Sequence, residues 1–323
     1  MTLHIREAEV RELLTMPMAI EAVEEVSRRL STGEAIVHAR RRIELPGGGF
    51  FHYMAAADFS AGYLGMKLYT YVRGKLRFVV PLYRIETGEM AALIEADVMG
   101  QLRTGAASGV ATKYMGRPEA RVAAVVGTGG QARTQLAAVA AVRKLTEARA
   151  YGRNTERLGE FCREMCEQLG IPVHAAASSE EAVRGVDIVC TATTASHAVV
   201  NGAHLSPGTH INAIGANHAH KRELDGETVA RAHTIITDSI EQAKQEAGDL
   251  ILGFAADESR WGAVRELHDI VSGKAPGRAS ASEISLFKSN GIAIWDVGVA
   301  VRVLRLAQER KMGELLPLWG DQA

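Results

Sequence analysis

The stretch from Val122 to Ala132, VAAVVGTGGQA, constrains the fold of this chain more than any other. Its first five residues are apolar without polar alternation, which is typical of a strand buried on both faces. A Gly-x-Gly-x-x-Ala pattern follows, and an Ala/Leu/Val-rich segment to Leu145 then favours a helix. The order strand, glycine turn, helix predicts a dinucleotide-binding unit, although a glycine turn in an ordinary α/β domain would read the same way.

Each small residue of the motif has a physical role in this interpretation. Gly127 permits the sharp turn, Gly129 lets a pyrophosphate approach the backbone, and Ala132 lets helix and strand pack closely. The N–H groups and the dipole at the helix start attract an anion. The candidate cofactor-binding residues here are Gly127, Thr128, Gly129, Gly130, Gln131 and Ala132.

The length, net charge and cysteine count of the chain narrow the class of protein. A length of 323 residues favours two domains, and 37 basic against 38 acidic residues give a net charge of −1. Nothing in this balance indicates a nucleic-acid or membrane partner, and no apolar run reaches the roughly 18 residues of a membrane span. Three cysteines make no disulfide framework, and the N-terminus lacks a signal-peptide core, so we expect a cytoplasmic protein.

The region before the glycine motif has a different pattern. Helices are expected at 9–14 and 17–33, followed by a mostly antiparallel sheet that forms a separate domain and the natural place for substrate groups. The expected strands are 40–45, 50–55, 64–72, 77–85 and 90–94. A helix is expected over 97–114, and Arg103 in its first turns suggests an anion bound nearby, because a helix N-terminus is already positive.

The end of the second strand of the nucleotide domain, 148–152, bears on the choice of cofactor. NAD sites usually place an acid about 20 residues after the glycine motif, but this chain has Arg153, Asn154, Thr155 and Arg157 there. These residues offer positive charge and donors to a 2′-phosphate, so we expect NADP to be preferred, with NAD possible. Alternatively, Asn154 or Thr155 only caps the next helix.

Strands and helices alternate through the rest of the chain. Further strands are expected at 173–176, 187–192, 210–214, 234–238 and 284–287, with helices at 156–169 and 240–247. This alternation predicts a Rossmann-type doubly wound parallel sheet, whose ligands bind at the carboxyl ends of the strands. A long C-terminal helix over 292–311 is expected to pack back on the first domain. We therefore expect one domain over 1–118, completed by 300–323, and the nucleotide domain over 119–299.

Cys162 and Cys166 lie one helical turn apart, but no second Cys/His pair completes a metal site, and we expect no bound metal.

Together these pieces resemble the ornithine cyclodeaminase/mu-crystallin family over nearly the whole chain. The matching stretches are 66–68 (MKL), 101–108 (QLRTGAAS), 127–132 (GTGGQA), 206–215 (SPGTHINAIG), 222–225 (RELD) and 286–292 (LFKSNGI). The resemblance implies a Rossmann domain, an α+β dimerisation and substrate domain formed by the N-terminal part and the C-terminal helix, and a homodimer. It also implies activities such as ornithine cyclodeamination, alanine dehydrogenation, and ketimine or pyrroline-2-carboxylate reduction.

The resemblance assigns roles to particular residues. Arg103 matches the arginine that holds the substrate carboxylate, a task suited to a planar guanidinium. Lys67 matches the lysine beside the reacting carbon, where a lowered pKa would let it exchange protons. A second carboxylate contact is expected from Arg40, with Arg41 close behind. The further candidates are Met54, Asn217 and His218 for the substrate, and Thr104, Thr191, Ala192, Thr193, Ile214, Gly215, Ser289 and Gly291 for the cofactor.

One departure from the family pattern matters. Ornithine cyclodeaminases and some alanine dehydrogenases carry Asp where this chain has Asn217. Because an amide is neither a base nor a counter-ion for a second ammonium group, cyclodeamination is disfavoured. His218 and His220 lie beside this position and are read equally well as proton donors or as surface residues.

We therefore expect an NAD(P)H-dependent reductase or dehydrogenase of small α-imino or α-amino acids, with Lys67 and Arg103 as the catalytic residues. The substrate would be a small imino, amino or keto acid. The alternatives are a cyclodeaminase that recycles bound NAD and a non-catalytic mu-crystallin-like binding protein.

Overall fold

The computed structural model describes residues 2–318. It consists of two compact units, Met1–Arg103 with Gly291–Ala323, and Thr104–Asn290. The first boundary falls inside one helix, α3 (Asp97–Met115). The boundaries expected after residues 118 and 299 stay predictions, and residues 319–323 of the expected C-terminal segment lie outside the described part of the chain.

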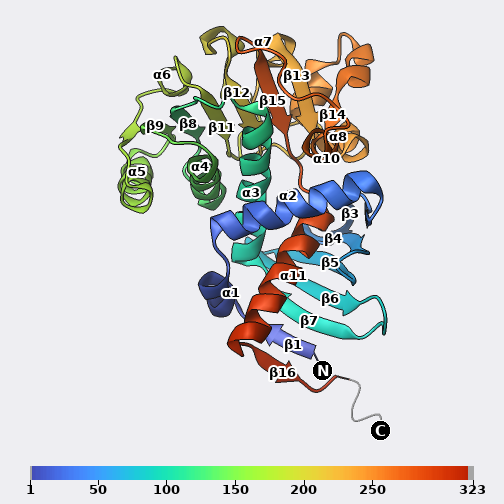
Figure 1. The fold of residues 1–323 in the computed structure, drawn as a ribbon. Coiled ribbons are helices and arrows are strands. Elements are labelled where there is room, and N and C mark those ends of the chain that lie inside the picture. Colours follow the sequence, from blue (N-terminus) through green and yellow to red (C-terminus); the bar gives the residue numbers. More distant parts are fainter. Residues whose placement is uncertain (1, 319–323) are drawn as a thin grey trace. The chain divides into compact units, whose positions relative to one another are not determined.

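The first unit is built on an eight-stranded sheet with the order β16-β1-β7-β6-β5-β4-β2, in which β3 also pairs with β4 (Figure 1). All of its pairs are antiparallel except β1 with β7. The strands are β1 (Thr2–Ile5), β2 (Ala35–Val37), β3 (Arg41–Leu45), β4 (Gly49–Asp58), β5 (Tyr63–Val72), β6 (Lys75–Arg84), β7 (Met90–Glu95) and β16 (Glu314–Leu316). The predicted antiparallel sheet is confirmed. Sequence reasoning missed three short strands, β1, β2 and β16.

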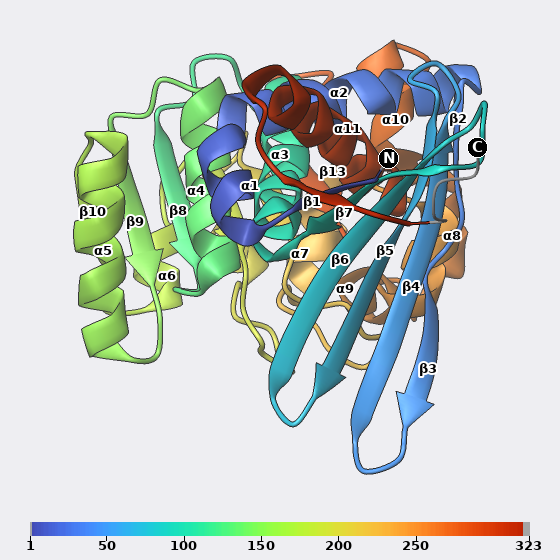
Figure 2. The same ribbon diagram turned by 90° about the horizontal axis from the view of Figure 1, so that it is seen from below.

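The helices of the first unit cover one face of this sheet. They are α1 (Glu7–Leu13), α2 (Met16–Thr32) and α11 (Ala293–Arg310). Gly65 on β5 lies so close to α11 that an added Cβ would be 3.2 Å from the Val297 side chain. The indole N–H of Trp295 donates to the Ser27 hydroxyl of α2 at 3.0 Å. The C-terminal helix therefore completes the core of the N-terminal sheet. Figure 2 shows β3–β6 as two long adjacent hairpins.

The second unit contains an eight-stranded, all-parallel sheet with the order β10-β9-β8-β11-β12-β15-β13-β14. Its strands are β8 (Val122–Val126), β9 (Glu147–Tyr151), β10 (Val173–Ala175), β11 (Ile188–Thr191), β12 (His210–Ala213), β13 (Ala232–Thr237), β14 (Arg265–Glu266) and β15 (Ile284–Lys288). Its helices are α4 (Gly130–Val142), α5 (Thr155–Leu169), α6 (Ser179–Val183), α7 (Gly226–Arg231), α8 (Ile240–Glu246), α9 (Gly248–Gly253) and α10 (Leu267–Ser272), with 3-10 turns at Gly202–His204 and Glu258–Ala263.

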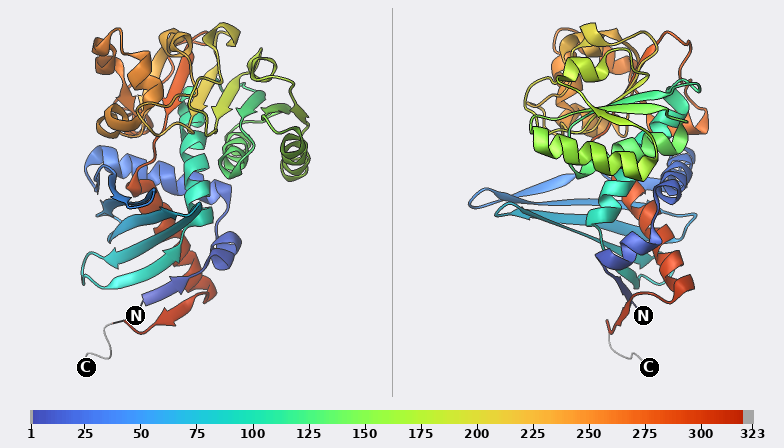
Figure 3. Two further views of the ribbon diagram at one scale, coloured as in Figure 1. Left: turned by 180° about the vertical axis from the view of Figure 1, so that it is seen from behind. Right: turned by 90° about the vertical axis from the view of Figure 1, so that its left-hand side faces the viewer.

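Helices cover both faces of this parallel sheet (Figure 3). Alternate residues of β8 enter different cores, because successive side chains of a strand point to opposite faces. Ala123 and Val125 pack with Leu136 of α4 and Phe161 of α5. Ala124 and Val126 belong to the other core, which also contains residues of α6, α7, α8 and α9. The predicted doubly wound fold is confirmed.

None of the helices within residues 2–318 is both long and apolar enough to cross a membrane.

Candidate active site

Three charged side chains meet in the first unit. Lys67 comes from β5, Arg103 from α3 and Asp296 from the first turn of α11. The Asp296 Oδ1 atom accepts hydrogen bonds from Lys67 Nζ and from Arg103 Nε, each at 3.0 Å. Lys67 is 4% exposed, Arg103 5% and Asp296 0%. We call this group the Lys67–Asp296–Arg103 cluster. It carries two positive charges and one negative charge out of water, which favours the approach of one further anion.

The environment of Lys67 changes its acidity. The pKa of Lys67 is lowered to about 8, because burial and the charges of Arg103 and Arg40 lower it more than Asp296 raises it. The ammonium also lies 5.1 Å from the centre of the Phe78 ring. A lysine with this pKa exchanges protons readily near neutral pH, which ordinary lysines do not.

Two buried polar atoms of the cluster have no hydrogen-bond partner among residues 2–318. They are Arg103 Nη1 and Asp296 Oδ2. Such atoms are costly to leave unsatisfied, so they indicate where a polar ligand would bind. Gly291, at φ +84°, lies against the guanidinium, and an added Cβ there would be 2.6 Å from Nη1. Glycine at this position therefore leaves room for Arg103.

The structure distinguishes among the three successive arginines. Arg40 Nε lies 3.4 Å from the sulfur of Met54, and its Nη2 donates to the Gly291 carbonyl at 3.3 Å. Met54 is paired with Lys67 across β4 and β5, so Arg40 and Met54 lie beside the cluster. Arg41 and Arg42 are exposed on β3, and Arg42 contacts Phe50 and Glu44.

The acidic partner of Arg103 was not predicted from the sequence. The position of Arg103 near a helix start suggested a bound anion, whereas the anion that it contacts in the structure is the Asp296 carboxylate. Asp296 lies in a helix that is otherwise apolar on its buried side, 193 residues from Arg103. The nearby motif FKSNGI, residues 287–292, pointed to this region but not to this residue.

The glycine motif in the second unit has the geometry expected of a phosphate cradle. Gly127 has φ +119°, and an added Cβ would lie 2.3 Å from the Ala192 carbonyl oxygen. Gly129 is the N-cap of α4, and a Cβ there would meet no atom within 4 Å. Helix α4 starts at Gly130, and Ala132 is fully buried against the sheet. Thr128 and Gln131 are half-buried at the same turn. The open space at Gly129 and the helix start fit a pyrophosphate.

At the end of β9 the candidate residues for a 2′-phosphate are exposed. Arg153, Asn154, Thr155 and Arg157 are all on the surface. The Asn154 side chain caps α5 by accepting a hydrogen bond from the Arg157 backbone N–H at 2.8 Å. Asn154 thus has a structural role, while Arg153 remains the exposed cation next to the strand.

Five of the other cofactor candidates lie at the ends of β11 and β12 and in the loops that follow them, while Ser289 follows β15 and Thr104 lies in α3. Thr191 is buried and donates to the Glu223 carboxylate at 2.7 Å, and Thr193 and Gly215 donate to the same carboxylate through their backbones. Ala192 and Ile214 are half-buried. Ser289 donates to Asp238 at 3.0 Å, and the Thr104 carbonyl accepts from Gln135 at 3.3 Å. Sequence reasoning did not single out Glu223.

Asn217 and His218 follow these loops. Asn217 is exposed, and the half-buried ring of His218 lies 5.6 Å from the ring of His220.

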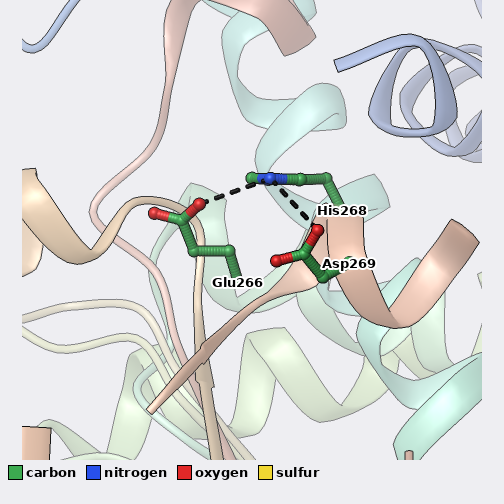
Figure 4. Close-up of side chains that lie close together, drawn as sticks. All are labelled: Glu266, His268 and Asp269. Carbon is green, nitrogen blue, oxygen red and sulfur yellow. Dashed lines mark ion pairs between the residues drawn. The ribbon is translucent and has the colours of Figure 1, made fainter. Parts of the chain in front are cut away.

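One group among the described residues has the spacing of metal ligands (Figure 4). His268 Nε2 lies 3.3 Å from a Glu266 oxygen and 3.7 Å from an Asp269 oxygen. Glu266 also accepts from the Ile240 backbone N–H at 2.7 Å, and this hydrogen bond ties the start of α10 to the start of α8. Cys162, which is buried, and Cys166, which is exposed, are both free thiols.

Comparison with known proteins decides the family. The model of the ornithine cyclodeaminase/mu-crystallin family matches residues 2–311. The chain belongs to this family. The resemblance read from the motifs is thereby confirmed.

Similar proteins include enzymes of imino-acid and amino-acid chemistry. A Δ1-pyrroline-2-carboxylate reductase of Bacillus cereus is 36% identical over 78% of this chain and 79% of its own length. The solved structure of the Thermococcus litoralis Δ1-pyrroline-2-carboxylate reductase in complex with NADH and L-proline is 35% identical, with a TM-score of 0.93 over 98% of this chain and 100% of that one. An archaeal alanine dehydrogenase dimer with bound NAD is 33% identical, with a TM-score of 0.92 over 98% and 99%.

Proposed function

We propose that this protein is an NAD(P)H-dependent reductase of small α-imino acids, which in the reverse direction is an amino-acid dehydrogenase. The observation that carries the proposal is the buried Lys67–Asp296–Arg103 cluster, with its lysine of lowered pKa and its arginine with an unsatisfied N–H group. The relatives that act on Δ1-pyrroline-2-carboxylate and alanine support the same class of substrate.

The first step in this proposal is the binding of the substrate carboxylate. Arg103 uses Nε to hold Asp296, and its Nη1 atom has no hydrogen-bond partner and would donate to the carboxylate. Arg40, beside Met54 and Gly291, is a second cation for the same group. Two guanidinium groups fix both the position and the plane of a carboxylate, so that the neighbouring carbon is held in one orientation.

The second step is proton transfer at nitrogen. When bound, a reduced nicotinamide supplies the hydride that the imine carbon accepts. As the carbon gains the hydride, the nitrogen needs a proton, and the Lys67 ammonium is the donor. Asp296 keeps the ammonium aimed and partly offsets the cost of its burial. In the oxidative direction the neutral Lys67 amine takes the proton back.

Residues of the second unit are suited to hold the cofactor. Gly127, Gly129 and the start of α4 would bind the pyrophosphate through backbone N–H groups. We propose a preference for NADP over NAD because Arg153 is an exposed cation at the end of β9, where an acid for the ribose hydroxyls is missing. The relatives described in complex with NADH and NAD support a nicotinamide dinucleotide in general.

A homodimer is also part of the proposal. The archaeal alanine dehydrogenase is described as a dimer. In this chain, the sheet face opposite Met54 and Lys67 carries Ile43, which is 51% exposed, and the stacked pair Phe51 and Tyr53. An apolar sheet face of this kind fits a second copy of the chain. Light scattering coupled to gel filtration would measure the mass of the assembly.

We also propose a cytoplasmic location, in keeping with three free cysteines.

The test is a substrate panel with the purified protein. Δ1-Pyrroline-2-carboxylate, Δ1-piperideine-2-carboxylate, pyruvate with ammonia, pyruvate with methylamine, and ornithine would each be assayed with NADH and NADPH by absorbance at 340 nm. We expect reduction of at least one imine and faster turnover with NADPH. Ammonia release from ornithine without net use of cofactor would replace the proposal with a cyclodeaminase. Tight binding of NAD(P)H with no turnover of any substrate would favour a binding protein.

A further inference from the structure

A second buried network lies in the second unit and shares no residue with the cluster that carries the proposed chemistry. Its centre is Glu223, which is 0% exposed and follows β12 in the segment that leads to α7. Its Oε2 accepts from the Thr191 hydroxyl and from the Gly215 N–H, both at 2.7 Å. Its Oε1 accepts from the Thr193 N–H at 2.6 Å. A single carboxylate thus ties the loop after β11 to the loop after β12.

These two loops, residues 191–193 and 214–216, are in direct backbone contact. An added Cβ at Gly215 would lie 2.3 Å from the Thr193 carbonyl oxygen and 2.5 Å from Glu223 Oε1. We call the pair the β11–β12 loops. No side chain fits at this contact. The Glu223 carboxylate accepts hydrogen bonds from both loops, and its loss would leave partly buried N–H groups without an acceptor.

Glu223 is itself fixed from behind. Its N–H donates to Asp249 Oδ1 at 2.6 Å, and its carbonyl accepts from Val199 and Val200. The other oxygen of Asp249 lies 3.0 Å from Lys288 Nζ, and both of these side chains are fully buried. Lys288 also donates to the Ala213 carbonyl at 3.4 Å, at the end of β12. Burial raises the pKa of Glu223 above its usual value, and the charge of Lys288 only partly offsets this.

The position of the network in the sheet indicates what it serves. The order β9-β8-β11-β12 places the glycine motif and the ribose-binding end of β9 on one side, and the β11–β12 loops on the other. A dinucleotide lies across the carboxyl edge of such a sheet, one mononucleotide on each half. Since β8 and β9 carry the residues for the adenosine half, the β11–β12 loops belong to the nicotinamide half.

We propose that Glu223 is a positioning residue for the nicotinamide half of the cofactor, because it holds the β11–β12 loops in the shape that this half needs. The inference rests on the proposed function, in that it takes a nicotinamide dinucleotide as the ligand. It does not depend on which imino acid is reduced.

The test compares the dinucleotide with its fragment. Dissociation constants for NADPH, NADH and ADP would be measured by calorimetry with the full chain, its Glu223→Gln variant and the control Glu241→Gln, which changes an exposed glutamate on α8. Glutamine turns one acceptor into a donor that faces the loop N–H groups. We expect about tenfold weaker binding of NADPH and NADH, as for loss of one charge-assisted contact, with ADP and the control within twofold.

A milder variant protects the test against misfolding. Thr191→Val removes only the hydroxyl donor and keeps the shape, and it should weaken NADPH binding a few-fold without affecting ADP. Equal losses for NADPH and ADP, or unchanged NADPH binding by folded variants, would overturn the role of Glu223. An unmodified protein that binds neither dinucleotide would instead refute the proposed function, on which the inference rests.

Discussion

The Lys67 ammonium and the Asp296 carboxylate lie 3.0 Å apart, although 229 residues separate them in the chain. Both are almost completely buried, and the same carboxylate oxygen also holds Arg103. The proton donor and the carboxylate anchor of the proposed reaction therefore share one counter-ion. A change at Asp296 should therefore affect both the proton donor and the anchor.

The pH dependence should report the state of Lys67. Its pKa is lowered to about 8, so the ammonium needed for imine reduction is present below that pH and lost above it. We expect kcat/KM for reduction to fall as the pH rises through about 8, and kcat/KM for amino-acid oxidation to rise through the same range. Initial rates in both directions between pH 6 and 10 would measure this. Parallel profiles in the two directions would contradict the assignment.

Asp296→Asn should move that profile. Asp296 raises the pKa of Lys67, so its neutralisation should shift the reductive limb to lower pH. Because two buried cations then lack their counter-ion, we also expect a loss of stability of about 3–5 kcal/mol, seen as a lower Tm. Glu309→Gln, at an exposed site on the same helix, should change neither quantity. A pH profile identical to that of the parent would show that Asp296 does not influence Lys67.

Lys67→Met should separate an enzyme from a binding protein. Methionine keeps much of the length of the side chain and removes the proton donor. We expect kcat to fall roughly 10²–10⁴-fold, the usual contribution of a general acid, while NADPH affinity stays near that of the parent. Steady-state kinetics and calorimetry on the folded variant would decide. Turnover within a few-fold of the parent would leave Lys67 with a structural role only.

Arg103→Lys should act on substrate binding. The variant keeps the positive charge but loses the planar fork that binds a carboxylate through two N–H groups, so KM for the imino acid should rise by about tenfold or more. Arg41→Lys, an exposed change on β3, is the matched control and should have a much smaller effect. If KM stayed constant while kcat fell, Arg103 would have to act in the chemical step rather than as an anchor.

Arg153→Ala should affect one cofactor only. Loss of a charge-assisted contact to a 2′-phosphate would weaken NADPH binding by about 1–3 kcal/mol and leave NADH binding nearly unchanged. Arg163→Ala, which changes an exposed arginine within α5, should affect neither. Fluorescence titration with both cofactors would give the comparison. Equal losses for NADH and NADPH would mean that Arg153 does not recognise the phosphate.

Local patterns allowed much of the fold to be predicted. The apolar run 122–126 and the glycines after it specify strand, turn and helix within about 20 residues, and the alternation that follows specifies a parallel sheet. The short strands β1 and β16 were missed because they depend on a partner: β16 pairs with β1, more than 300 residues away, and neither has a strong pattern of its own.

The residues of the site likewise include some that the sequence predicted and some that only the structure reveals. Lys67 and Arg103 lie in family motifs and were proposed from them. Asp296 lies outside those motifs, and Glu223 lies in the stretch 222–225 but was given no role, since the importance of a single acid arises only when the fold surrounds it with donors. At Asn154 the sequence left two roles open, because an asparagine there could bind the cofactor or cap the next helix. The structure shows the cap, in which the side chain accepts from the Arg157 N–H.

The discontinuity of the first unit has a consequence for synthesis on the ribosome. Seven of the eight strands of its sheet are translated first, but α11, which packs on one face and carries Asp296, emerges with β16 only after the entire second unit. Until then Lys67 and Arg103 lack their counter-ion, and the sheet face that α11 covers lacks part of its cover. The nucleotide-binding unit, contiguous in the chain, is free to fold before the unit that precedes it, which reverses the usual N-terminal-first order. The helix that is translated last, α11, thus completes the unit whose translation began first.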